Sequence, residues 1–146
     1  MSGSKTAILT AIYAILTADT TLKALLGGSV KARNVKADPD EENPYLLYDL
    51  SPGNAGAEDG MREGTLLIDI IHHGQTSETA YQIKDRLIGL IDRRAIITAH
   101  GEATAVRVFY DQEEDIAEDQ EHLWHVATKW SVRYFPAAEL SAVIGR

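Results

Sequence analysis

Four of the five histidines stand in two close pairs, and histidine pairs are a common beginning of a metal site. His72 and His73 are adjacent, and His122 and His125 are three residues apart. Both pairs fall in stretches that alternate with a period of two, where residues an odd number of positions apart point to opposite faces of a strand. A zinc site needs three or four convergent ligands. We therefore predict no metal site and interpret these histidines as ordinary surface or strand-end residues.

A dense run of carboxylates near the C-terminus is the second candidate for chemistry. It comprises Asp111, Glu113, Glu114, Asp115, Glu118, Asp119 and Glu121. Carboxylates are preferred ligands of Ca²⁺ and Mg²⁺, but the run lacks the alternating ligands and the central glycine of a calcium-binding loop. We interpret residues 112–121 as a solvated acidic hairpin loop. Exposed loop charges contribute little to stability, so lysine at positions 113–115 is expected to leave the fold nearly untouched.

Signatures of catalysis and of cofactor binding are missing from the sequence. It contains no G-x-S-x-G, no phosphate-binding G-x-x-x-x-G-K and no dinucleotide fingerprint. It contains no cysteine, which excludes disulfides, thiolate chemistry and cysteine-based zinc sites. A carboxylate pair for glycoside hydrolysis stays open, although nothing singles one out. We predict no catalytic residue, no cofactor and no enzymatic activity.

The two tryptophans suggest either a base-stacking platform or a core. Trp124 and Trp130 share their strand face with Val126 and Val132, and the net charge of the chain is −8. Stable binding to nucleic acid requires a basic surface, which this sequence lacks. Core packing is therefore the better interpretation, and sequence-specific DNA binding is not expected.

These residues must be positioned by a sheet, because the longest periodic stretch is a strand. From His122 to Phe135, large apolar residues alternate with mostly polar ones, and Pro136 then ends the pairing. Glu63–His73 is apolar on both faces, so we expect both of its faces to be covered. Further strands are predicted at Val30–Val35, Tyr45–Leu50 and Ala103–Asp111, and Ala95–Thr98 is expected to be either the start of a short strand or a turn.

Apolar residues at helical spacing predict two main helices, Thr6–Leu16 and Ser77–Arg94. A short helical segment, Thr20–Leu26, follows the first one, with Asp19 as its cap and Gly27-Gly28 at its end. The order of elements predicts an α+β fold, a mostly antiparallel sheet with the two main helices packed on one face. We expect one domain over residues 1–146, with flexible tails at 1–3 and 137–146.

A glycine-rich segment, Ser51–Arg62, separates two of the predicted strands and shows no hydrophobic period. Such a segment is typical of a long mobile loop that a partner orders on binding. Candidate contacts with another subunit or a partner are Pro52, Asn54, Glu58, Asp59, Met61 and Arg62. No stretch is long enough to span a bilayer, so we expect no membrane contact and a soluble, intracellular protein.

The order of these segments resembles the tail-completion, or tail-terminator, proteins of long-tailed bacteriophages. The resemblance covers residues 7–135. It rests on an N-terminal amphipathic helix that continues into LTADTTLKALLGG (16–28), on PYLLYDL (44–50), on GTLLIDI (64–70) followed by SETAYQIKDRLIGLID (77–92), and on a closing strand, HLWHVATKWSVRYF (122–135).

This resemblance implies a non-enzymatic virion protein that is assembled in the host cytoplasm and found in the tail or neck. It implies a ring of identical subunits, typically a hexamer, that ends the tail tube. The implied partners are the tail tube protein and the head–tail connector protein, and DNA passes through the ring without specific binding. The acidic segment then becomes a candidate lumen or docking loop through Glu113, Glu114, Asp115, Glu118 and Asp119.

Two alternatives stay open at this point. The first is a neighbouring neck protein such as a head-closure protein, which the sequence separates poorly from a tail terminator. The second is a small ligand-binding or enzymatic α+β domain with its site near residues 51–62. A deep pocket with convergent carboxylates and histidines would favour the second alternative.

Overall fold

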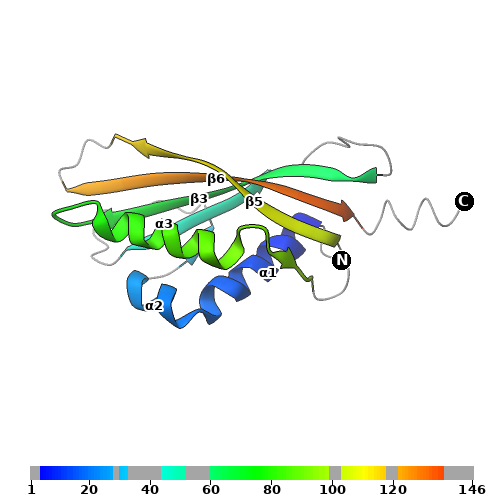
Figure 1. Cartoon of the computed structure of the whole chain (residues 1–146), viewed down its shortest axis with the longest axis horizontal. Coiled ribbons are helices and arrows are strands. Elements are labelled where there is room, and N and C mark those ends of the chain that lie inside the picture. The colour runs from blue at the N-terminus through cyan, green and yellow to red at the C-terminus, as the bar shows by residue number, and fades with distance from the viewer. Residues whose placement is uncertain are drawn as a thin grey trace, which may run out of the picture.

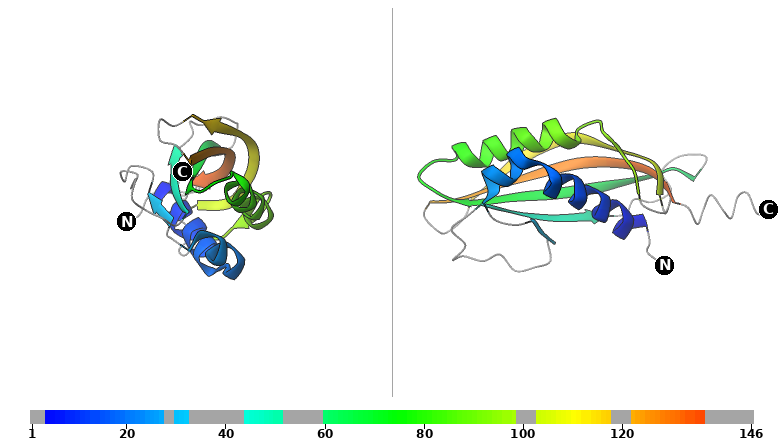
Figure 2. Two further views of the ribbon diagram at one scale, coloured as in Figure 1. Left: turned by 90° about the vertical axis from the view of Figure 1, so that its left-hand side faces the viewer. Right: turned by 90° about the horizontal axis from the view of Figure 1, so that it is seen from below.

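Helices cover one face of a twisted sheet in the computed structural model of the chain (Figures 1 and 2). The structure describes residues 4–27, 30–32, 44–51, 60–98, 103–117 and 122–136. Within these ranges the six strands run in the order β1-β2-β3-β6-β5-β4, and every neighbouring pair except β1 with β2 is antiparallel. The predicted α+β class with a mostly antiparallel sheet is confirmed.

The helices and strands lie close to their predicted positions, with one exception in β5. The helices are α1 (Ser4–Ala18), α2 (Thr20–Leu26) and α3 (Glu78–Ile91). The strands are β1 (Val30–Ala32), β2 (Tyr45–Ser51), β3 (Arg62–His73), β4 (Ala95–Ile96), β5 (Ala103–Ile116) and β6 (Leu123–Pro136). The predicted tails, 1–3 and 137–146, lie outside the described residues, and the expectation of one domain stays a prediction.

The two central strands, β3 and β6, pair along their whole length, from Arg62 opposite Tyr134 to His73 opposite Leu123. The large residues of β6 turn toward the helices, as the period of two predicts. Trp130 and Val132 are fully buried there, against the apolar faces of α1 and α3. The helix-facing core also contains Ile8, Ile12, Leu16, Leu66, Ile68, Ile70, Ile83 and Leu87.

The opposite face of the sheet, which we call the outer face, carries a smaller apolar cluster at one end. Tyr45, Leu47 and Ile71 are buried there, and Leu123 packs against them. The expected burial of Glu63–His73 on both faces is thus confirmed at this end of β3. Because the cluster is already buried in the single chain, it needs no second subunit to cover it.

The acidic hairpin loop predicted at residues 112–121 is wrong for its first half. Strand β5 continues to Ile116, and Gln112–Ile116 pair with Lys129–His125 of β6. The polar side chains of this half show no apolar alternation, so the sequence did not indicate a strand. Its strand conformation depends on backbone hydrogen bonds to β6 rather than on burial. Glu118 and Asp119 lie outside the described residues.

Two irregularities in β5 decide which way its side chains face. The register shifts between Thr104 and Arg107, and again between Tyr110 and Gln112. At the first shift Ala105 has a φ of 52°, and Thr104 is exposed rather than sharing the buried face of Val106. At the second shift Asp111 has no partner on β6, which is the pattern of a β-bulge. The regular alternation of buried and exposed residues in this strand therefore begins at Val106.

The predicted cap of α2 is confirmed. The Asp19 carboxylate accepts a hydrogen bond of 2.8 Å from the Leu22 backbone N–H, and Gly27 ends the helix with a φ of 57°. The same carboxylate accepts two hydrogen bonds from Arg86 of α3, at 2.5 and 2.9 Å. This hydrogen bonding to Arg86 lowers the pKa of Asp19 from 3.8 to about 2. Asp19 therefore connects α2 to α3.

We expect the Asp19–Arg86 contact to make stability depend on pH below 4. Because folding depresses the pKa of Asp19, its contribution is present above the unfolded pKa of 3.8 and is lost as the pH falls toward about 2. Asp19→Asn keeps a good cap but removes the charge. The difference in unfolding free energy between wild type and Asp19→Asn should shrink between pH 5 and pH 2 in denaturant titrations. A difference that does not change with pH would contradict this assignment.

No single described helix is long and apolar enough to span a membrane. Helices α1 and α2 reach that length and composition only when they are taken together, and they are bent by 83° relative to each other.

Candidate functional site

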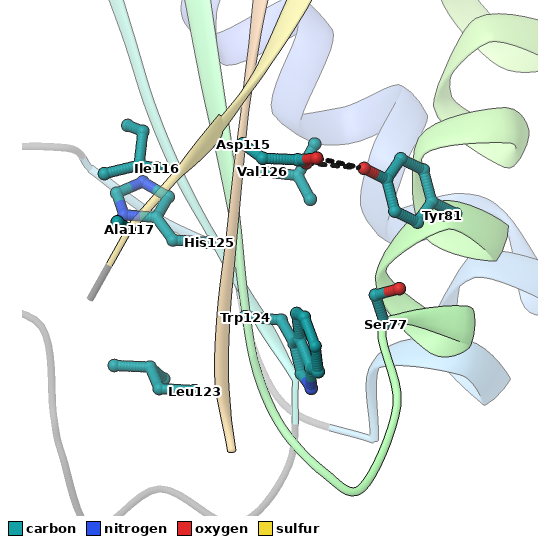
Figure 3. A pocket seen from close by; sticks show the side chains of 9 residues that line it. All are labelled: Ser77, Tyr81, Asp115, Ile116, Ala117, Leu123, Trp124, His125 and Val126. Atoms are coloured by element: carbon teal, nitrogen blue, oxygen red, sulfur yellow. Dashed lines mark hydrogen bonds between the residues drawn. The ribbon is translucent and has the colours of Figure 1, made fainter. Parts of the chain in front are cut away.

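A pocket of about 340 Å³ lies where the N-terminal end of α3 meets the ends of β5 and β6 (Figure 3). The side chains that line it are those of Ser77, Tyr81, Asp115, Ile116, Ala117, Leu123, Trp124, His125 and Val126. We treat it as the candidate site because it brings a tyrosine, a carboxylate and a histidine from separate elements into one region.

The strongest polar contact in the pocket joins Tyr81 of α3 to Asp115 of β5. The Tyr81 hydroxyl lies 2.5 and 2.6 Å from the two carboxylate oxygens. This hydrogen bond is the main reason why the pKa of Tyr81 is raised above its usual value of 10. The phenol therefore keeps its proton at neutral pH, which suits a fixed donor and not a nucleophile or a base.

The remaining polar groups of the pocket do not converge on this pair. In Figure 3, Trp124 lies on the side of Ser77 and Tyr81, whereas His125 lies on the other side of β6. The Trp124 indole N–H donates to the Gly74 carbonyl at 3.0 Å and so closes the turn before α3. An acid–base pair must reach the same reacting atoms. Among the described residues, this pocket offers no such arrangement.

The neighbouring acidic residue, Glu113, also faces α3. It lies 2.9 Å from Lys84 Nζ and accepts a hydrogen bond from the Tyr110 hydroxyl at 3.3 Å. Hydrogen bonding to Glu113 raises the pKa of Lys84, and burial is the main cause of the raised pKa of Tyr110. Together with Asp115, Glu113 therefore fastens the far half of β5 to α3.

Glu114 differs from the acidic residues on either side of it. It lies opposite Ala127 of β6, which places it on the outer face, and it is exposed. Of the residues predicted to form a lumen or docking loop, Glu113 and Asp115 thus contact α3 within the same subunit. Glu114 is the one that the described structure leaves turned away from the helices.

Because Glu113 and Glu114 face opposite sides of the sheet, we no longer expect lysine to be equally harmless at positions 113–115. Glu113→Lys places a second ammonium against Lys84, so we expect it to lower the unfolding free energy by about 1 kcal/mol. Glu114→Lys should change it by less than about 0.5 kcal/mol, because this exposed residue lies on the face of the sheet away from Lys84. Parallel urea titrations of the two variants measure the comparison. Equal losses would contradict the opposite orientation of the two residues.

Sequence reasoning missed a second polar contact, which lies on the outer face. Asp69 of β3 is 3% exposed, and its carboxylate lies 3.1 Å from the Nε2 atom of His125 on β6. The available signal was a carboxylate inside the apolar run LLIDII, because a buried carboxylate requires a partner. Spacing alone could not identify His125, which lies 56 residues away.

The adjacent histidines of β3 do not form a site with each other. His72 lies opposite Trp124 and His73 opposite Leu123, so they occupy different faces. The pKa of His72 is lowered, mainly by burial and also by the neighbouring His73. The described part of the chain contains no group of three or more His, Cys, Asp or Glu that could hold a metal ion.

The segment predicted as a partner-contact loop is described only at its margins. Arg62 is the first residue of β3 rather than the end of a loop, and Met61 precedes it. Pro52, Asn54, Glu58 and Asp59 lie outside the described residues. Their role stays a prediction.

Comparison with known proteins reveals similarity of fold only. No known protein family and no curated protein matches the sequence. A solved chain described as "Virion of native gene transfer agent (GTA) particle" is 16% identical with a TM-score of 0.68, covering 88% of this chain and 95% of that one. A second solved chain is 21% identical with a TM-score of 0.58, covering 90% and 94%. Both similarities span nearly the whole of each chain.

Proposed function

We propose that this chain is a structural virion protein that ends a phage-like tail tube as a ring and joins the tail to the head connector. The observation that carries the proposal is the fold, which is similar to that of a chain of a gene transfer agent virion over 88% of this chain and 95% of that one. The resemblance of segments 16–28, 44–50, 64–70, 77–92 and 122–135 to tail-terminator proteins favours the same role.

The polar contacts of the described residues fit a structural role. The contacts of Asp115, Glu113 and Asp19 each connect one secondary-structure element to another. A binding or catalytic site would instead aim several polar groups at one empty position. The chemistry of these groups therefore supports a rigid subunit.

The proposed partners are further copies of this chain in a ring, typically six, together with the tail tube protein and the connector protein. DNA would pass through the ring without being bound. The net charge of −8 suits such a passage, because a basic lumen would retain the phosphates. The protein would then be found in the tail or neck of the particle.

Deletion of the gene from a particle-producing strain tests the proposal. We expect unjoined heads and tails, with tails of irregular length because nothing ends the growing tube, and restoration by the wild-type gene. Electron-microscopic class averages of purified protein, alone and on tail tubes, should show rings with a central hole. Tails of normal length beside leaking heads would indicate a head-closure protein instead. Normal particles without the protein would contradict any virion role.

A further inference from the structure

The sheet has two open edges in the described part of the chain, and they differ in kind. At one edge β4 covers β5 only at Val106 and Arg107. The end of α3 covers the next positions, because the Arg93 N–H donates to the Val108 carbonyl at 2.6 Å and the Tyr110 N–H donates to Asp92 at 2.7 Å. Beyond them, residues 111–116 have β6 on one side and no described strand on the other. The opposite edge is β1.

These two edges have opposite charges in the sequence. Residues 111–116, the open part of β5, include four carboxylates and no lysine or arginine. Strand β1, Val30–Ala32, has one charged residue, Lys31. An open strand edge is a template for another strand, and complementary charges favour one partner over others. The β1 edge of a second copy is therefore complementary in charge to the open part of β5.

The register places the two edges at the same level of the sheet. Lys31 pairs with Leu47, Leu47 with Asp69, Asp69 with Ala127, and Ala127 with Glu114. We call such a series of paired residues across the sheet a row. The rows on either side connect Val30 to Asp115 and Ala32 to Glu113 in the same way. Residues 30, 31 and 32 are therefore level with residues 115, 114 and 113, and the two strands run antiparallel.

We propose that β1 of one copy pairs antiparallel with residues 111–116 of β5 in the next copy, which sets Lys31 directly opposite Glu114. Opposite charges at directly opposed positions stabilise a strand pair, and like charges weaken it. Because both edges end the same rows, the pairing needs no slip of one strand along the other. A head-to-tail contact of this kind can repeat from copy to copy, and it forms a ring when its rotation closes. The inference rests on the ring of the proposed function and names the surface that forms it.

Cysteine cross-linking tests the pairing directly, because the natural chain has no cysteine. Within one chain, positions 31 and 114 are separated by four strand spacings, roughly 19 Å along the sheet, which is too far for a disulfide. Under mild oxidation, Lys31→Cys/Glu114→Cys should therefore give a ladder of covalent oligomers that ends at the ring. The matched control, Lys31→Cys/Gln112→Cys, moves one cysteine two residues along the same strand and should cross-link at least about tenfold less. Each single-cysteine variant can give dimers at most.

A charge exchange provides the second test. Glu114→Lys and Lys31→Glu should each weaken every subunit contact by about fivefold, whereas the double exchange should restore assembly. Native mass spectrometry measures the oligomers of the free protein. If a free protein stays monomeric, electron-microscopic class averages of tail tubes measure its assembly there. Thermal unfolding checks that each variant folds.

The possible failures of the two proposals are distinguishable. Two results together would overturn the edge pairing and leave the virion role standing. They are rings that persist in both Glu114→Lys and Lys31→Glu, and rings of Lys31→Cys/Glu114→Cys that do not cross-link. A wild-type protein that forms no ring, alone or on tail tubes, would overturn the ring itself and with it the proposed function.

Discussion

Replacing Trp130 by alanine is expected to lower the free energy of unfolding by about 3–5 kcal/mol. The side chain is fully buried, and its ring packs edge-to-face against Tyr110 with 5.0 Å between centroids. Its indole N–H donates to the Thr128 hydroxyl at 2.9 Å, and that hydroxyl donates to the Ile68 carbonyl at 2.7 Å. The truncation would leave a cavity and remove the donor to Thr128. Chemical denaturation measures the loss.

Trp124→Ala is the matched control for this prediction. Trp124 lies on the same face of β6 but is only partly buried, near the end of the strand. We expect a smaller loss, because less apolar surface returns to water when it is truncated. An equal or larger loss for Trp124→Ala would contradict the placement of Trp130 at the centre of the core.

The second large effect is expected at the Asp69–His125 contact on the outer face. His125→Leu should lower the free energy of unfolding by about 3 kcal/mol, because it leaves a buried carboxylate without this partner. The double variant Asp69→Leu/His125→Leu should recover most of that loss, since apolar residues can replace a buried, mutually paired set of polar groups at little cost. Denaturant titrations of the single and double variants measure the coupling.

A result in which the two single losses simply add would contradict the interaction between these residues. Asp69→Leu alone completes the cycle and separates the pair from the general effect of added apolar volume.

The parts of the fold that were predictable from sequence are those in which burial determines the pattern. The alternation in β6 and the helical spacing in α3 reflect which side chains leave water, so their positions could be predicted to within a few residues. The cap at Asp19 was also predictable, because the capping interaction is local. Its ion pair with Arg86 was not, since the two residues are 67 positions apart.

The second half of β5 shows the opposite case. Its residues are acidic and mostly exposed, so no apolar period marked residues 112–116 as a strand. Their conformation depends on β6, which is long enough to pair with them. The contacts of Glu113 and Asp115 with α3, and the rows that connect Lys31 to Glu114, all follow from that pairing. Such features require the register, which no single stretch of sequence contains.

The bulge at Asp111 limits how this strand can change during evolution. It separates an apolar half, whose alternation is set by the core, from an acidic half, whose alternation is set by α3. Because Tyr110 already lies opposite Trp130 and Gln112 opposite Lys129, deletion of Asp111 would restore regular pairing and leave Glu113 and Asp115 facing α3. A deletion of one residue within the acidic half, with the pairing to β6 kept, would instead turn the residues beyond it to the opposite face. Insertions or deletions of two residues beyond the bulge would preserve the facing of the rest. Beyond the bulge, the length of this strand can therefore change in even steps, whereas odd steps exchange its two faces; at the bulge itself one residue can be lost without this exchange.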